Sequence, residues 1–334
     1  MGPDHGGRLN RAVSRYGIPP AEWLDLSTGI NPWPWPVPTL PPEVWHRLPE
    51  ADDGLEAASG DHFPVPAGAR CLPVAGSQAA IQALPRLRAR SRVGVPAPGC
   101  AEHGWWWQQA GHSVERLAPE TVDAALDRLD VLVWIHPNNP TGLALEPEQL
   151  LEWHARLHAR GGWLVVDEAF IEATPEASLA PYVDAPGLVV LRSLGKFFGL
   201  AGVRGGWVLA DAELCTALEA ALGPWAVSGP ARWVMGQALA DEAWQARNRT
   251  RLASAAATLD ADLRNAGLAA PTGTALFRYC PHPRAEGIHH ALAAEGILTR
   301  LFTDPPALRF GLPPDDAARQ RLCAAVRALE CTSP

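Results

Sequence analysis

The stretch VVLRSLGKFFGLAGVRGGW, residues 189–207, carries a lysine between a run of apolar residues and a glycine-rich segment. Ser193 lies three residues before Lys196, and Arg204 lies eight residues after it. A lysine among aromatic and aliphatic neighbours loses hydration, which makes its amine nucleophilic toward an aldehyde. A hydroxyl and a guanidinium that flank it are suited to hold one phosphate dianion. The stretch therefore predicts a Schiff-base lysine beside a phosphate site, and the alternative is a surface lysine whose amine reaches solvent.

An acidic residue ends another apolar run, WLVVD, at Asp167. An acid at the end of a buried strand is placed to meet a cationic group of a ligand, although it can also cap the next helix. A phosphate, an aldehyde and a cationic ring nitrogen together describe pyridoxal phosphate. The sequence therefore pairs Lys196 with Asp167 as the lysine and the acid of a pyridoxal-phosphate site.

Strand, turn and helix alternate along the middle of the chain, in residues 69–87, 91–111, 131–142, 161–170 and 187–200. This alternation predicts a parallel sheet covered by helices on both faces, with ligands at the carboxyl ends of its strands. The turn AGSQAA opens a helix with N–H groups suited to phosphate, and NNPTG follows a strand, although each is also an ordinary turn.

The ends of the chain differ from this middle part. Residues 1–45 are rich in Pro and Trp and cannot form a continuous helix. We expect an N-terminal arm over residues 1–45 that joins a small domain. A large cofactor-binding domain is expected over residues 46–222, and a small α+β domain over residues 223–334.

Composition excludes several classes of protein. The net charge of −8 and the scattered Lys and Arg residues argue against a nucleic-acid partner. No window approaches 18 uninterrupted apolar residues, and the N-terminus has no apolar export segment, so we expect a cytoplasmic protein without membrane contact. The 6 Cys residues form no CxxC pair and no Cys/His ligand spacing, which predicts reduced thiols and no metal.

The segments AGSQAA, NNPTG, VVDEAF and SLGK, followed by Arg204, resemble the aspartate-aminotransferase-like, fold type I enzymes that use pyridoxal phosphate. The resemblance covers residues 20–312. It implies an α/β fold: a large domain with a mostly parallel seven-stranded sheet sandwiched by helices, plus a smaller α+β domain. It makes Lys196, Asp167 and His103 the catalytic residues. The implied cofactor-binding residues are Gly76, Ser77, Gln78, His103, Asn139, Asp167, Phe170, Ser193, Lys196 and Arg204.

Within these enzymes the chain is most similar to the threonine-phosphate decarboxylases of cobalamin biosynthesis, and next to the histidinol-phosphate aminotransferases. The similarity rests on the opening stretch of residues 5–32, on DEAFIE with Phe170, and on GILTRLF with Arg300. It implies a small phosphorylated amino acid as substrate and a homodimer. The implied substrate-binding residues are His5, Gly6, Thr28, Gly29, Asn31, Asn139, Arg300 for the distal phosphate and Arg309 for the carboxylate.

The chain also departs from that pattern. Leu48 stands where a tyrosine of the neighbouring subunit usually contacts the cofactor phosphate, and Gly195 replaces a Ser or Thr, so two phosphate contacts are lost. His103 takes the place of the aromatic residue over the pyridine ring, with Trp105 as the alternative. The sequence leaves open decarboxylation or transamination, because the bond that breaks is the one perpendicular to the ring. It also leaves open threonine phosphate or serine phosphate.

Overall fold

The computed structural model describes residues 2–3, 5–268 and 270–331, and its contacts divide the chain into two compact units. The small unit comprises Met1–Trp33, Asn139–Leu143 and Arg247–Pro334. The large unit comprises Pro34–Asn138 and Ala144–Ala246. Among the described residues, no helix is both long and apolar enough to cross a membrane. The domain bounds at residues 45 and 222 stay a prediction.

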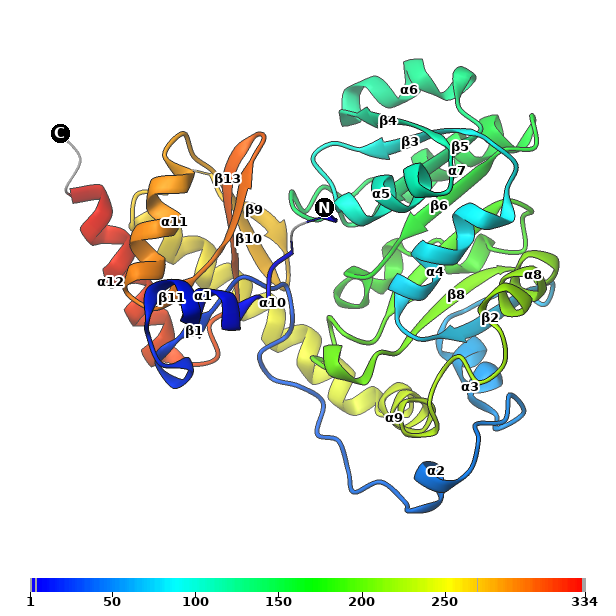
Figure 1. Cartoon of the computed structure of the whole chain (residues 1–334), viewed down its shortest axis with the longest axis horizontal. Coiled ribbons are helices and arrows are strands. Elements are labelled where there is room, and N and C mark those ends of the chain that lie inside the picture. The colour runs from blue at the N-terminus through cyan, green and yellow to red at the C-terminus, as the bar shows by residue number, and fades with distance from the viewer. Residues whose placement is uncertain (1, 4, 269, 332–334) are drawn as a thin grey trace. The chain divides into compact units, whose positions relative to one another are not determined.

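The large unit is built on a seven-stranded sheet of order β2-β8-β7-β6-β5-β3-β4 (Figure 1). Strands β4, β3, β5, β6 and β7 run parallel to one another, and β8 pairs antiparallel with both β7 and β2. The mostly parallel seven-stranded sheet expected from the resemblance is confirmed. The strands are β2 (Ala69–Val74), β3 (Arg92–Pro96), β4 (Ser113–Leu117), β5 (Val131–Ile135), β6 (Trp163–Asp167), β7 (Leu188–Ser193) and β8 (Gly206–Asp211).

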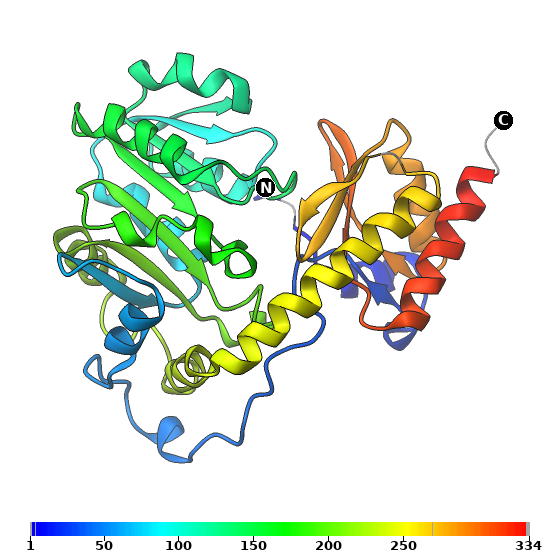
Figure 2. The ribbon, with the colours of Figure 1, turned by 180° about the vertical axis from the view of Figure 1, so that it is seen from behind.

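Helices cover both faces of this sheet, since α4, α5 and α8 lie over one face in Figure 1 and α7 lies over the other in Figure 2. Both faces are buried, which explains why the central strands are continuous apolar runs. The α-helices are α2 (Glu43–His46), α3 (Leu55–His62), α4 (Ser77–Ala83), α5 (Ala101–Gln109), α6 (Val122–Ala125), α7 (Pro147–His158), α8 (Ala212–Leu222) and α9 (Gly229–Ala240). Short 3-10 turns join them at Leu84–Leu87, Pro119–Thr121, Leu126–Arg128, Ile171–Ala173, Pro175–Ala177, Ala180–Tyr182 and Ala201–Val203.

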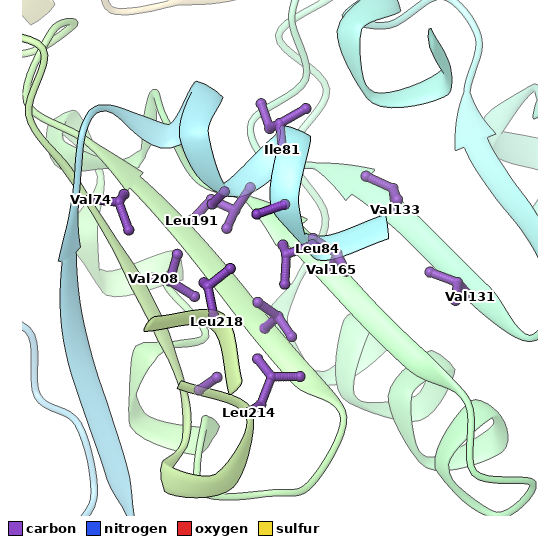
Figure 3. Packing of buried hydrophobic residues seen from close by; sticks show 14 of the residues in the cluster. Val74, Ile81, Leu84, Val131, Val133, Val165, Leu191, Val208, Leu214 and Leu218 are labelled. Atoms are coloured by element: carbon purple, nitrogen blue, oxygen red, sulfur yellow. The ribbon is translucent and has the colours of Figure 1, made fainter. Parts of the chain in front are cut away.

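The core of the large unit lies between the sheet and the helices α4 and α8 (Figure 3). Val165 and Leu191 from the central strands meet Ile81 and Leu84 from one helical segment and Leu218 from another, and all are buried. Burying side chains of this size stabilises the fold by about 1.5–3 kcal/mol each. This packing fixes the strands whose carboxyl ends carry the candidate site.

The small unit contains a four-stranded antiparallel sheet of order β12-β13-β10-β9 and a two-stranded parallel sheet of β1 with β11. This arrangement agrees with the expected α+β class. Its strands are β1 (Leu24–Asp25), β9 (Thr272–Thr274), β10 (Phe277–Pro281), β11 (Ile297–Leu298), β12 (Arg300–Thr303) and β13 (Pro306–Gly311). Its helices are α1 (Leu9–Tyr16), the 3-10 turn Pro20–Glu22, α11 (Ala285–Ala294) and α12 (Asp316–Cys331), and α10 (Glu242–Asn265) ends in it.

Candidate functional site

Polar residues stand at the carboxyl ends of neighbouring parallel strands in the large unit. Asp167 ends β6 and Ser193 ends β7. In the sheet register Asp167 lies between Ile135 of β5 and Leu191 of β7. The predicted acid and the serine of the SLGK segment are therefore at one edge of the sheet, where α/β sheets bind ligands.

Asp167 is held from two sides. His103 Nε2 lies 2.8 Å from Asp167 Oδ2, and the backbone N–H of Ala169 donates to Asp167 Oδ1 at 3.0 Å. Both side chains are buried, His103 at 1% and Asp167 at 6% exposure. Because an ionised carboxylate only accepts, His103 donates Nε2–H and so orients Asp167. Sequence reasoning predicted a stacking role for His103 and missed this contact.

Lys196 lies in apolar surroundings close to the expected partners. Its Nζ is 5.6 Å from the centre of the Phe170 ring, and its neighbours Phe197 and Phe198 are fully buried. The lysine itself is half-buried, which disfavours a lysine that extends into solvent. The glycine at position 195, where the family usually has Ser or Thr, has a steric explanation. A Cβ there would lie 3.0 Å from the Cα of Ala201.

Four of the residues expected at a phosphate gather around the turn before α4. Gly76 has φ +73°, and a Cβ there would lie 2.9 Å from an Arg204 guanidinium nitrogen. Gly206 lets the backbone N of Ser77 approach, because a Cβ at Gly206 would be 2.8 Å from it. Gly206 is also the register partner of Ser193. The set offers two hydroxyls and one guanidinium beside the start of a helix, which is the chemistry that fits a phosphate dianion.

The side chain of Gln78, another residue expected at the phosphate, is engaged with an acid. The Gln78 amide donates to Glu102 Oε2 at 2.6 Å, and the Trp106 indole N–H donates to the same oxygen at 2.7 Å. One amide N–H of Gln78 is therefore already used within the chain. Leu48 is 63% exposed in the large unit, and Trp105 is half-buried.

A buried ionic network lies beside these residues and was missed by sequence reasoning. Arg192 of β7 pairs with Glu168 at 2.7 Å and with Glu172, and all three side chains are buried. Burial would raise the pKa of Glu172, but Arg192 and His62 outweigh it and lower that pKa to about 2. Glu168 directly follows Asp167, and Arg192 directly precedes Ser193. The network therefore ties the ends of β6 and β7 together.

Sequence reasoning also missed Cys100, a half-buried residue near Asp167. It precedes α5, the helix that carries His103. Burial, together with the nearby Asp167 charge, raises the pKa of its thiol to about 11. The thiol is therefore protonated at neutral pH and lies close to Asp167. Its only sequence signal is its place three residues before His103.

In the small unit, Arg309 and Asn139 come together. Arg309 is 6% exposed, and it donates through Nη1 to Asn139 Oδ1 and through Nη2 to the Ser27 carbonyl oxygen at 2.8 Å. Arg300 is the register partner of Arg309 on the next strand. Two of the expected anion-binding arginines are therefore adjacent on one sheet face.

The N-terminal residues of the expected substrate set lie near the same segment of the small unit. A Cβ on Gly6 would lie 2.1 Å from the Ser27 carbonyl oxygen, and the Gly7 N–H donates to Ser27 Oγ at 2.7 Å. Thr28 follows Ser27 directly. Its methyl group lies close to Gly7, since a Cβ on Gly7 would be 3.2 Å from Thr28 Cγ2. Gly29 is buried, whereas His5 is exposed.

Asn31 has a structural role in the same unit. Its amide donates to the Trp33 carbonyl oxygen at 2.9 Å and to Asn248 Oδ1 at 3.1 Å, and its Oδ1 accepts from the Trp33 N–H at 2.9 Å. These bonds shape the chain between the expected substrate residues and Trp33.

The family of the chain follows from a match over residues 55–326 to Aminotransferase class I and II. The chain belongs to the aminotransferase class I and II family. The threonine-phosphate decarboxylase of Pseudomonas aeruginosa is 54% identical over 323 residues, 97% of each chain. That of Sinorhizobium sp. is 43% identical over 336 residues, 98% of each chain.

A solved structure of this aminotransferase fold confirms the architecture. The histidinol-phosphate aminotransferase of Sinorhizobium meliloti, in complex with pyridoxal-5'-phosphate, superposes with a TM-score of 0.81 at 21% identity. The match covers 98% of this chain and 96% of that chain. At this identity the likeness shows the fold alone.

Proposed function

We propose that this chain is a pyridoxal-phosphate-dependent decarboxylase that converts L-threonine O-3-phosphate into (R)-1-amino-2-propanol O-2-phosphate in cobalamin biosynthesis. The observation that carries the proposal is the 54% identity to a threonine-phosphate decarboxylase over 97% of both chains. The buried acid and the half-buried lysine at adjacent strand ends supply the chemistry that the reaction needs.

The large unit would hold the cofactor through the residues that its sheet edge brings together. Ser77, Ser193 and Arg204 would bind the phosphate, and Gly76 would leave room for the Arg204 guanidinium beside it. Asp167 would meet the pyridine nitrogen, with His103 keeping the carboxylate in place. When bound, pyridoxal phosphate supplies an electron sink for a bond at the substrate Cα.

Lys196 would supply the proton that Cα receives in the decarboxylation. Its amine is half-buried next to Phe170, which places it at the strand ends where the substrate would react. As an ammonium that has taken the proton of the substrate's amino group, Lys196 would donate that proton to Cα once carbon dioxide has left. Asn139, in the small unit, would bind the phenolic oxygen of the cofactor.

The small unit would recognise the substrate through its anionic groups. Arg309 would bind the carboxylate, and its bonds to Asn139 and the Ser27 carbonyl fix its guanidinium in place. Arg300 would bind the distal phosphate. His5, Gly6, Thr28, Gly29 and Asn31 complete the proposed substrate set. Contacts remote from the bond that breaks add orientation, which lowers the barrier.

We further propose that the enzyme works as a homodimer in the cytoplasm. Among the described residues of the large unit, the most exposed large apolar side chains are Trp45 at 64%, Leu48 at 63% and Trp225 at 59% exposure. Trp225 and Pro49, the neighbour of Leu48, line one cavity of about 730 Å³. Exposed apolar surface of this kind marks a protein interface. A fully active monomer in sedimentation at low concentration would contradict the proposal.

The reaction class is tested by product analysis with threonine phosphate as the only added substrate. The proposal expects carbon dioxide and aminopropanol phosphate in equal amounts, and no keto acid. A keto acid that forms only when an amino acceptor is present would favour a histidinol-phosphate-type aminotransferase instead. Serine phosphate, offered in the same assay, measures the preference for the substrate methyl group.

A further inference from the structure

A row of polar side chains crosses the four-stranded sheet of the small unit. In the register of β10, β13 and β12, Tyr279 lies opposite Arg309, and Arg309 lies opposite Arg300. Residues directly opposite each other on neighbouring strands point to the same face, and like charges in that position repel. A face that carries two adjacent guanidinium groups is therefore suited to receive an anionic ligand.

The Tyr279 hydroxyl group, in this row, is buried without a hydrogen-bond partner among the described residues. Tyr279 is 3% exposed. A buried hydroxyl without a partner costs about 1–3 kcal/mol, so native structures rarely keep one without a use. Burial raises the pKa of Tyr279, and the hydroxyl therefore remains a donor at neutral pH.

The Tyr279 ring and the Arg300 guanidinium pack against the same phenylalanine. Its ring meets the Phe302 ring of β12 edge-on, at 5.7 Å between centres. The Arg300 guanidinium carbon lies 5.4 Å from the centre of the same Phe302 ring. Tyr279 and Arg300 therefore share Phe302 as a neighbour. Arg309, by contrast, already donates to Asn139 and Ser27.

We infer that Tyr279 is a substrate-binding residue whose hydroxyl donates a hydrogen bond to the phosphate group that Arg300 binds. The inference rests on the proposed function, because it takes its ligand to be a phosphorylated substrate. Tyr279 adds a neutral donor to a cationic site. It thereby favours a phosphate, which has three terminal oxygens, over a smaller anion that one guanidinium satisfies.

The test replaces Tyr279 by Phe, which keeps the ring contact with Phe302 and removes only the hydroxyl. Tyr182→Phe, at a 43% exposed tyrosine of the large unit, is the matched control. The kcat/KM for threonine phosphate should fall about 10-fold or more in Y279F, as expected for a lost hydrogen bond to a charged group. The value for unphosphorylated threonine should change less than about 2-fold. Equal losses for both substrates, or no loss, would overturn the inference.

A second measurement separates ligand binding from a structural role. Inorganic phosphate binding to each holoenzyme is measured by calorimetry, and thermal unfolding is followed with and without phosphate. Y279F should bind phosphate about 10-fold more weakly and, without phosphate, should be at least as stable as the wild type, because an orphan hydroxyl has been removed. A large loss of stability without phosphate would show that the hydroxyl has a structural partner and would contradict the inference.

The two proposals can fail separately. Wild-type enzyme that releases no carbon dioxide from threonine phosphate contradicts the proposed function. The ratio of phosphate affinities between wild type and Y279F still tests Tyr279, because that measurement needs no turnover. An active wild type with an unchanged affinity ratio would overturn the role of Tyr279 alone.

Discussion

The strand ends of the large unit and the sheet face of the small unit treat charge in opposite ways. In the large unit each buried acid has a partner within the chain, as Asp167 has His103 and Glu172 has Arg192. In the small unit Arg300 and Arg309 lie side by side, and the Tyr279 hydroxyl lacks a partner among the described residues. In the first region the buried acids are paired within the chain, whereas the second places two cations side by side and gains from an anion. We therefore expect the first to control stability and the second to control specificity.

The sharpest way to break this comparison is to remove the cation of the large unit's network. Arg192→Met leaves Glu168 and Glu172 buried without their shared partner, so the free energy of unfolding should fall by about 3–5 kcal/mol. Urea denaturation measures the loss. Arg128→Met, which removes an exposed pair with Glu115, is the control and should cost about 0–1 kcal/mol. A loss below about 1 kcal/mol for Arg192→Met would mean that the network does not support the strand ends.

The complementary change removes a cation from the small unit's row. Arg300→Ala should lower kcat/KM for threonine phosphate. The loss should correspond to roughly 2–4 kcal/mol in activation free energy, the range for the loss of one side of a charge-assisted pair. The free energy of unfolding should hardly change, because the substitution also removes the repulsion between Arg300 and the neighbouring Arg309. Arg327→Ala, at an exposed arginine of α12, is the control. Equal losses for threonine phosphate and unphosphorylated threonine would make Arg300 structural.

Much of this comparison was within reach of the sequence, and the reason is local. The spacing of Ser193, Lys196 and Arg204 lies within one strand and its following turn, so the residues stay together whatever the rest of the chain does. Asp167 was predictable because it ends an apolar run whose neighbours are parallel strands.

The contacts that the sequence did not predict all join segments distant in the chain. His103 and Asp167 are 64 residues apart, and their hydrogen bond depends on how α5 packs on the sheet. Tyr279 meets Arg309 only through the register of β10 with β13. A shift of one residue would turn Tyr279 to the other face. Strand register is set by tertiary packing, which no short motif records.

A smaller effect concerns pH and sharpens the comparison within the small unit. His289 and His290 of α11 are both half-buried, and His289 Nδ1 lies 2.8 Å from Thr299 Oγ1, next to Arg300. Burial, with the charges of His290, Arg15 and Arg300, lowers the pKa of His289 to about 4.

Because the folded state of His289 binds its proton more weakly than the unfolded state, its contribution to stability is present above the unfolded pKa of about 6.5 and is lost as pH falls toward 4. His289→Asn should therefore flatten the fall of stability between pH 6.5 and pH 4, measured by urea denaturation at each pH. His46→Asn, at an exposed histidine of the large unit, should leave that fall unchanged. An identical slope in His289→Asn and the wild type would contradict the assignment.

The central claim, that Lys196 carries the cofactor at the strand ends of the large unit, is tested most directly by borohydride reduction of the holoenzyme followed by peptide mapping. The account predicts one pyridoxyl group, on the peptide that contains Lys196. Lys196→Ala should bind no reducible cofactor and should have no turnover with either threonine phosphate or threonine. A pyridoxyl group on another residue, or equal labelling of Lys196→Ala, would contradict the account.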